Sequence, residues 1–357
     1  MTRLPSPSAS DHPASCRRSL LLLLLCLALP AWGATPVLRV LAWPGYAEPE
    51  VVKQFEQRHG VRVEVTTVNL DATLWQKVSQ NNAAYDVFAV NAAELQRYIG
   101  AGLVQPLHPE QIPNTQRQLA RFRDLAAIPG LTRAGKAFGI PYTYSQMGLI
   151  YDRRQFSAPP QSIDVLWDPR YRGRVIVYDG GTHNFSLAAQ SLQLRSPFRL
   201  AAGDLPRAAA RLIELRRNAL GLYTQPEESV RLFMRHKAAL MFANYGMQQV
   251  HLLRAAGADI GYVIPREGAL AWLDCWVVTQ GTRDALLAHA WIDHMLDEQA
   301  SRLLVERQGL ANTLAEQTDG HGGDRLVWLE PAEDDARRER LWGRIRSGDR
   351  LSRVLAP

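Results

Sequence analysis

The feature that constrains this chain most is a repeated alternation of short apolar strands with amphipathic helices. Residues 38–42 form a predicted buried strand, a helix begins at Pro49, and residues 61–65 alternate as a second strand. A further helix follows, with Asp71 as its expected N-cap, and then a third strand over 85–90. This order of elements predicts βαβ units and a largely parallel sheet.

The second half of the chain predicts another α/β region. Two extended stretches without a flexible linker join it to the first, which indicates lobes connected by a rigid hinge. A hairpin-like segment is expected over 271–278, before a helix through Ala290. The remaining predicted elements are an extended crossover over 140–151, strands over 174–178, 238–244 and 260–265, and helices over 206–217 and 226–235.

The chain has 357 residues, which is too many for one compact core and fits two domains. We predict that residues 34–140 and 264–313 form lobe 1, and that residues 141–263 and 314–357 form lobe 2. In open α/β sheets, ligands bind beyond the carboxyl ends of the strands. The ligand cleft is therefore expected between the lobes.

The N-terminus has the pattern of a secretory signal peptide. Arg17 and Arg18 precede an unbroken leucine run over 20–25, and small residues end this segment at Gly33. The apolar run is about a dozen residues, against the roughly twenty that span a bilayer. We therefore expect residues 1–33 to be removed and the mature protein to be periplasmic.

The residue types argue against several function classes. Cys275 is the one cysteine after residue 33, so no internal disulfide is expected. The net charge is +6, of which residues 1–33 supply +2, and the remaining +4 is spread out, with the densest basic stretches on predicted helix faces, which does not indicate a nucleic-acid partner. No nucleophile elbow or zinc-helix motif occurs, and Asp179, His183 and Ser186 are a chance triple, so we expect neither an enzyme nor a cofactor.

A collinear set of short motifs resembles a known family. The motifs span most of the chain after residue 37, and the set is specific although no single motif is. They resemble the periplasmic polyamine-binding proteins of ABC transporters, an extracellular solute-binding family. The matching segments are 41–46, 55–61, 85–87, 139–142, 166–173, 265–268 and 272–274.

This resemblance implies the two-lobe type II periplasmic-binding-protein fold, with mixed or parallel sheets flanked by helices and crossover strands at a hinge. It also implies a monomer that closes on a small-molecule ligand, such as a polyamine or another amine, and passes it to an ABC permease. The alternative is a sensor of the same fold that docks on a membrane signalling receptor.

The resemblance carries four site residues over to this chain. Trp43 and Tyr46 would wall the cleft, Trp272 would stack on the ligand, and Asp274 would pair with an amine. Five further positions belong to the expected site, although several differ from the family pattern: Asn91, Asp179, His183, Asn244 and Tyr245.

The differences remove negative charge from the expected site. His183 stands at the second position where the family usually has an acid, and an ammonium buried without a partner costs several kcal/mol. A shorter amine, a monocation or an uncharged ligand is therefore expected in place of spermidine or spermine. Metal binding stays a lesser alternative, through His183 or, as in related iron(III) receptors, through Tyr142, Tyr144 and Tyr245.

Overall fold

The first sheet begins with the βαβ units that the sequence predicts. The computed structural model describes residues 35–316 and 326–356, so the predicted signal segment 1–33 lies outside the described residues. The unit that starts at Val37 is described below. β1 pairs in parallel with β2 and with β3, and Gly60 ends the intervening helix with a left-handed φ of 64°.

This sheet has the strand order β13-β6-β12-β3-β1-β2, and β14 pairs with the start of β12. Its strands are β1 (Val37–Ala42), β2 (Arg62–Thr67), β3 (Val87–Asn91), β6 (Ile140–Met147), β12 (Ala269–Val278), β13 (Ala311–Asn312) and β14 (Leu326–Trp328). The helices between and after these strands are α1 (Pro49–His59), α2 (Asp71–Gln80), α3 (Ala92–Gly100), α4 (Ala120–Arg123), α9 (Ala285–Met295) and α10 (Glu298–Gln308). A small hairpin is formed by β4 (Thr132–Arg133) and β5 (Lys136–Ala137).

The second sheet is mixed, with the order β11-β7-β10-β8-β9. β8 pairs in parallel with β9 and β10, whereas β7 runs antiparallel to β10 and β11. Its strands are β7 (Leu149–Asp152), β8 (Val175–Tyr178), β9 (Ala219–Tyr223), β10 (Leu240–Phe242) and β11 (Ile260–Val263). The accompanying helices are α5 (Gly181–Ser191), α6 (Asp204–Asn218), α7 (Pro226–His236), α8 (Met247–Ala255), α11 (Asp335–Arg346) and α12 (Leu351–Val354).

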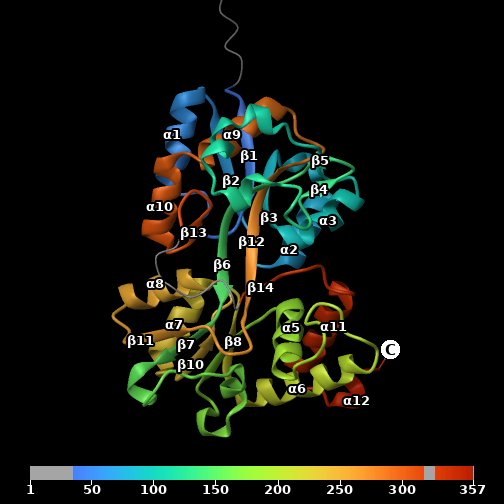
Figure 1. Cartoon of the computed structure of the whole chain (residues 1–357), viewed down its shortest axis with the longest axis vertical. Helices are drawn as coiled ribbons and strands as arrows, with labels where there is room; N and C mark the ends of the chain where they lie inside the picture. The colour runs from blue at the N-terminus through green and yellow to red at the C-terminus, as the bar shows by residue number, and fades with distance from the viewer. Residues whose placement is uncertain (1–34, 317–325, 357) are drawn as a thin grey trace, which may run out of the picture. The chain divides into compact units, whose positions relative to one another are not determined.

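Two pairs of strands carry the chain between the sheets. β6 leads into β7 at Gly148, and β11 leads into β12 (Figure 1). Gly148 leaves no room for a side chain, because a Cβ there would overlap the ring of Tyr262. That tyrosine accepts a hydrogen bond from the Gly148 N–H at 3.1 Å and donates one to the Gln146 carbonyl at 2.8 Å. The crossover is therefore closely packed.

The expected hairpin over 271–278 is wrong. These residues belong to the single ten-residue strand β12, which lies between β6 and β3 and is antiparallel to both. Every residue of β12 is buried, so the strand is an apolar run without the alternation of a half-exposed hairpin. No Gly, Pro or Asn interrupts the run to form a turn.

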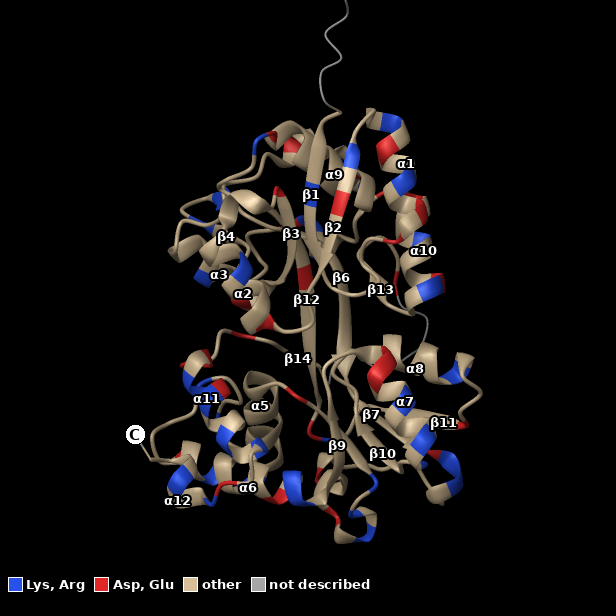
Figure 2. Cartoon of the chain, turned by 180° about the vertical axis from the view of Figure 1, so that it is seen from behind, with Lys and Arg blue, Asp and Glu red and all other residues tan. Residues whose placement is uncertain are grey.

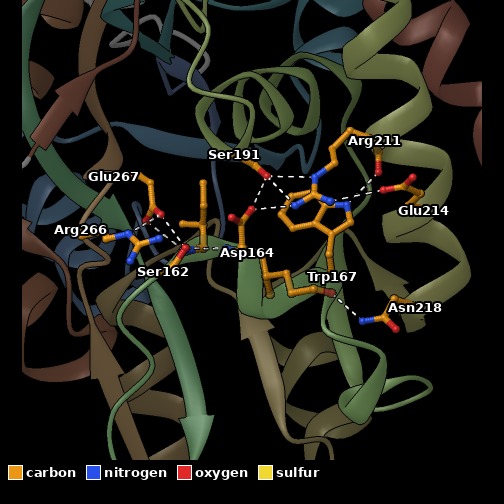
Figure 3. A network of polar contacts seen from close by, with 11 residues as sticks. Ser162, Asp164, Trp167, Ser191, Arg211, Glu214, Asn218, Arg266 and Glu267 are labelled. Carbon is orange, nitrogen blue, oxygen red and sulfur yellow. Dashed lines mark hydrogen bonds and ion pairs between the residues drawn. The ribbon is translucent and has the colours of Figure 1, made fainter.

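The motif segments 166–173 and 265–268 make packing and hydrogen-bond contacts within the fold. Trp167, in the short 3₁₀ helix η5 (Ile163–Trp167), donates a 2.8 Å hydrogen bond to the Arg211 carbonyl, and the Arg211 guanidinium lies 4.3 Å from its ring centroid (Figure 3). Glu267 accepts hydrogen bonds from the Ser162 hydroxyl and the Ile163 N–H at 2.5 and 3.1 Å. These contacts fix η5 against α6 and against the approach to β12.

The core places large aromatic side chains beneath the first sheet. Trp276 of β12 and Trp291 of α9 are fully buried, with ring centroids 5.9 Å apart and an interplanar angle of 89°. Such edge-to-face pairs add about 0.5–1.5 kcal/mol to the effect of area burial. Within the described ranges, none of the helices has the length and apolar character that crossing a membrane requires.

Candidate functional site

A cavity of about 50 Å³ lies where elements of the two sheets meet. Trp43, Tyr46 and Asn91 reach it from the ends of β1 and β3, and Trp272 and Asp274 reach it from β12. The second sheet contributes residues after β8 and β10. The full lining is Trp43, Pro44, Tyr46, Asp71, Asn91, Tyr178, His183, Asn244, Tyr245, Gln248, Trp272 and Asp274.

Asp274 is the buried carboxylate of this cavity, with 6% of its surface exposed. Tyr46 donates a 2.7 Å hydrogen bond to its Oδ2, and the Asn91 amide donates one of 3.2 Å to its Oδ1. Burial raises the pKa of Asp274 to about 7, although these two hydrogen bonds oppose the shift. Among the described residues, no basic side chain forms an ion pair with Asp274. The carboxylate is therefore hydrogen-bonded but lacks a cation.

The local fold positions both donors. Tyr46 follows the turn after β1, and its ring packs edge-on against that of Tyr142 at 5.5 Å. Asn91 ends β3 opposite Asp274 in the β12 ladder and also caps α3, since its Oδ1 accepts the Ala93 N–H at 2.9 Å. The amide nitrogen of Asn91 is thereby directed to Asp274.

Two tryptophans line the cavity from the first sheet. Trp272, 7% exposed, donates a 3.0 Å hydrogen bond from its indole N–H to the carbonyl of Asn244, which follows β10 of the second sheet. Trp43 follows β1 and packs against both apolar clusters of the core. Trp272 lies within the strand β12 and not in the hairpin expected over 271–278.

The opposite wall comes from the second sheet. His183, in the first turn of α5, shares a 2.7 Å hydrogen bond between its Nδ1 and the Asn244 Oδ1, and its ring stacks on Tyr178 at 5.8 Å. Tyr245 donates to the Thr224 carbonyl at 2.6 Å. Tyr178 reaches the other side of the cavity, where its hydroxyl donates to the Asn69 carbonyl at 3.3 Å.

The structure brings eight of the nine predicted residues together and leaves Asp179 out. Asp179 accepts hydrogen bonds from the Trp342 indole and the Arg346 guanidinium, both at 2.8 Å, and it does not line the cavity. The reason is the alternation of side chains at the end of a strand. Tyr178 takes the direction toward the cavity, so Asp179 faces α11.

Four lining residues were not predicted as site residues: Pro44, Asp71, Tyr178 and Gln248. The expected capping role of Asp71 is wrong, because it is the first residue of α2 and makes no capping hydrogen bond from its side chain. Burial raises its pKa, with the charge of His183 acting in the opposite direction. Its position beyond the carboxyl end of β2, on the same rim as Trp43, was the signal that could have identified it.

The metal alternatives find no support in the geometry. Over residues 35–316 and 326–356, no group of three His, Cys, Asp or Glu side chains is arranged to hold a metal ion. Of the three tyrosines considered for iron(III), Tyr245 lines the cavity, whereas Tyr142 donates to the Tyr46 carbonyl at 3.2 Å and Tyr144 packs against Phe122.

Comparison with known proteins supports a binding role. Residues 50–320 match the family model described as bacterial extracellular solute-binding protein. The chain is 25% identical to a putrescine/agmatine-binding protein of Pseudomonas aeruginosa, over 89% of this chain and 94% of the relative. It is 22% identical to a putrescine-binding periplasmic protein of Escherichia coli, over 72% of this chain and 73% of the relative.

Solved structures share the fold. A lipoprotein of Treponema pallidum superposes with a TM-score of 0.74 at 17% identity, covering 87% of this chain and 99% of that one. A spermidine/putrescine ABC transporter substrate-binding protein of Streptococcus pneumoniae superposes with a TM-score of 0.68 at 20% identity, covering 90% and 99%. The expected type II periplasmic-binding-protein fold is confirmed.

Proposed function

We propose, from the premise that this chain belongs to the bacterial extracellular solute-binding proteins, that it captures a small organic cation in the cavity around Asp274 and delivers it to an ABC permease. The relatives from Pseudomonas aeruginosa and Escherichia coli are named for binding putrescine, and the first also for agmatine. Both ligands are amines. They are the ligand class that an uncompensated carboxylate suits.

One observation carries this proposal, the environment of Asp274. A carboxylate that is 6% exposed and has no basic partner among the described residues is costly to keep charged, which is why its pKa is raised. An ammonium group that enters the cavity would remove this cost. The surrounding rings of Trp43, Tyr46 and Trp272 supply apolar and cation–π contacts for the same group.

Ligand capture would use closure of two lobes, with the boundaries at residues 140/141, 263/264 and 313/314 that the sequence predicts. Contacts that cross the cavity support this, since the indole of Trp272 reaches Asn244 and the hydroxyl of Tyr178 reaches Asn69. Both contacts would break on opening. The closely packed crossover at Gly148 would then serve as a hinge element.

Export, a monomeric state and the absence of catalysis complete the proposed function of this protein. We infer that it acts in the periplasm after removal of residues 1–33, that it works as a monomer and that it performs no chemistry on its ligand. The signal pattern around Arg17 and Arg18 supports export. The membership of a solute-binding family supports a role without catalysis.

A thermal-shift screen of the mature chain from Ala34 tests the ligand class. The panel contains amines, neutral amino acids, sugars and carboxylates at matched ionic strength. We expect stabilisation by amines, since a ligand at a hundredfold excess over its Kd adds about 2.7 kcal/mol. Stabilisation by anions or sugars, with none by any amine, would show that the cation proposal is wrong.

A further inference from the structure

A second cavity, of about 160 Å³, adjoins the first. Asp71, Asn91 and His183 line both cavities, so the two spaces meet at these side chains. One wall of the second cavity comes from α2 and α3 of the first sheet, and the other comes from α5 and α11 beside the second sheet. About 10–15 Å³ of such space holds one water molecule, so this cavity has room for a larger group.

The lining of the second cavity is rich in carboxylates. It has five carboxyl groups and one guanidinium, that of Arg97. Arg97 lies 3.7 Å above the ring of Trp75 and 4.0 Å from Glu94, and 39% of its side chain is exposed. It therefore offsets at most part of the negative charge. The five acidic residues are Asp71, Glu94, Glu330, Asp335 and Glu339.

Neutral donors hold the acids of α11 in place. The Thr182 hydroxyl donates to the Asp335 Oδ1 at 2.7 Å, and the N–H groups of Gly181 and Thr182 donate to the Glu339 Oε1 at 2.7 and 3.1 Å. These hydrogen bonds orient both carboxylates without cancelling their charge. Figure 2 shows basic residues on α11 as well as on α1, α6 and α12. None of the α11 arginines lines the second cavity, since Arg97 of α3 is the one arginine of its described lining.

The acids on the two walls act on one another. Burial raises the pKa of Glu94 well above its ordinary value, and the negative charges of Asp335 and Asp71 add to the shift. The pKa of Asp71 is also raised by burial and by Asp335. Asp71 and Glu94 belong to one wall and Asp335 to the other. Glu94 and Asp335 also share a side-chain hydrogen bond, so the two carboxyl groups meet between the walls and need either a shared proton or a cation there.

We propose that the ligand is an elongated dication, whose first ammonium pairs with Asp274 and whose second cationic group enters the second cavity among Asp71, Glu94 and Asp335. This inference rests on the proposed function and specifies its ligand class. The half-buried ring of Trp75 and the buried ring of Phe198 provide an apolar wall there for a methylene chain. Since none of the described residues form a three-ligand metal group, an organic cation fits better than a metal ion.

The second subsite would supply negative charge that the residues after β8 do not provide to the ligand. Asp179 is engaged by Trp342 and Arg346, and His183 stands where the resembling family has an acid. Carboxylates on α2, α3 and α11 would carry this negative charge instead. Of the ligands expected from the sequence, a shorter amine with two cationic groups would then be favoured over a monocation or an uncharged molecule.

Isothermal titration calorimetry on the mature chain tests this inference. The probes are α,ω-diaminoalkanes of increasing length, the n-alkylamines of matching length, and calcium chloride alone. The variants are the double substitution Glu94→Gln with Asp335→Asn, the single substitution Asp274→Asn, and Glu306→Gln as a control at an exposed glutamate of α10. Each variant is checked for folding by circular dichroism.

We expect the wild type to bind its best diamine more tightly than the matching monoamine. The double variant should weaken diamine binding roughly ten- to hundredfold, the range for charge-assisted hydrogen bonds. It should leave monoamine binding nearly unchanged, which also reports that the first cavity is intact. Asp274→Asn should weaken both probes, and Glu306→Gln neither.

Equal affinity for diamines and monoamines, or diamine binding that survives the double variant, would overturn the dication inference and leave the proposed function standing. Tight binding of calcium by the wild type, lost in the double variant, would also overturn it. The absence of binding by every amine would instead reject the proposed function, and the inference with it.

Discussion

The indole N–H of Trp272 on β12 donates a 3.0 Å hydrogen bond to the carbonyl of Asn244, which follows β10 in the second sheet. Both residues line the cavity around Asp274. One side chain therefore provides an aromatic wall for a ligand and also joins the two sides of the cavity. A change at Trp272 should affect binding through both roles. One substitution that removes only the N–H and another that removes the whole ring separate the two roles.

Trp272→Phe keeps most of the ring and removes the N–H donor. A neutral hydrogen bond contributes about 1 kcal/mol, which corresponds to a roughly fivefold weaker affinity for an amine if the bond forms only on closure. Trp272→Ala removes the ring as well, so no thermal shift is expected with any amine. Trp167→Phe is the matched control, because its indole also donates to a backbone carbonyl, that of Arg211, outside the cavity. Amine affinity that is unchanged in Trp272→Ala would contradict the site.

Tyr46→Phe tests the donor that holds Asp274 in its charged form. Loss of the 2.7 Å hydrogen bond should raise the pKa of Asp274 further and weaken amine binding at neutral pH, with partial recovery at higher pH. Calorimetry at several pH values measures both effects. Tyr142→Phe serves as control, since that hydroxyl donates to the Tyr46 carbonyl and makes no contact with Asp274. Equal losses in the two variants would point to packing as the cause.

The pH dependence of binding follows from the same carboxylate. The pKa of Asp274 is raised to about 7 by burial, so a cation must displace a proton from it below that pH. Amine affinity should therefore rise with pH by up to about tenfold per unit below pH 7 and level off above it. Asp71, whose pKa is also raised, contributes with the same sign. Asp274→Asn should remove most of the slope, and a flat profile in the wild type would contradict the assignment.

The unliganded protein should show the opposite trend in stability. The folded-state pKa of Asp274 exceeds the ordinary 3.8 of an unfolded chain, so the folded state binds the extra proton. The contribution of this group is present at low pH and is lost as the pH rises through about 7. Urea unfolding of the wild type and of Asp274→Asn, compared between pH 4 and pH 8, measures it. An amine at saturating concentration should reverse the trend.

Local patterns predicted most of the fold, because each early element carries its own signal. The helix α1 begins at Pro49, as the sequence predicts, and a glycine in the left-handed conformation, Gly60, follows its last residue. β12 was mistaken for a hairpin because a strand buried on both faces shows no alternation. Its antiparallel partners, β3 and β6, are distant in the sequence, so no pattern within residues 269–278 predicts this pairing.

Eight of the residues that line the first cavity were named from the sequence, and four of them came from the collinear motifs: Trp43, Tyr46, Trp272 and Asp274. The second cavity could not be found in this way. Glu94 and Asp335 lie far apart in the sequence and on amphipathic helices, where an acid is most simply interpreted as a solvent-facing residue. Only the packing of α11 against α5 brings Asp335 into the cavity wall.

Gly246 is a backbone position beside the site that admits no side chain. Its φ of +55° and ψ of −124° are unfavourable for other residues, and a Cβ there would overlap the Ser145 hydroxyl and the Gln146 carbonyl of β6. Gly246→Ala should lower the free energy of unfolding by at least about 1–3 kcal/mol. Gly343→Ala, in the open middle of α11, should instead raise it by about 0.5–1 kcal/mol. Urea unfolding compares the two, and similar effects would contradict the steric argument.

Glu267 should affect stability without affecting binding. Its carboxylate is 7% exposed and accepts hydrogen bonds from Ser162 and Ile163, so Glu267→Ala leaves two donors without their acceptor. We expect a loss of about 1–3 kcal/mol in the free energy of unfolding, measured by urea denaturation. Glu267→Gln keeps an acceptor and should lose less.

The affinity for amines should stay the same in both Glu267 variants, because Glu267 lines neither cavity. Glu306→Ala, at an exposed site, should change neither quantity. If amine affinity fell together with stability in Glu267→Ala, the contacts of η5 with the approach to β12 would belong to the closing motion. The hinge would then extend beyond the crossover at Gly148, since β12 carries both Trp272 and Asp274 into the cavity.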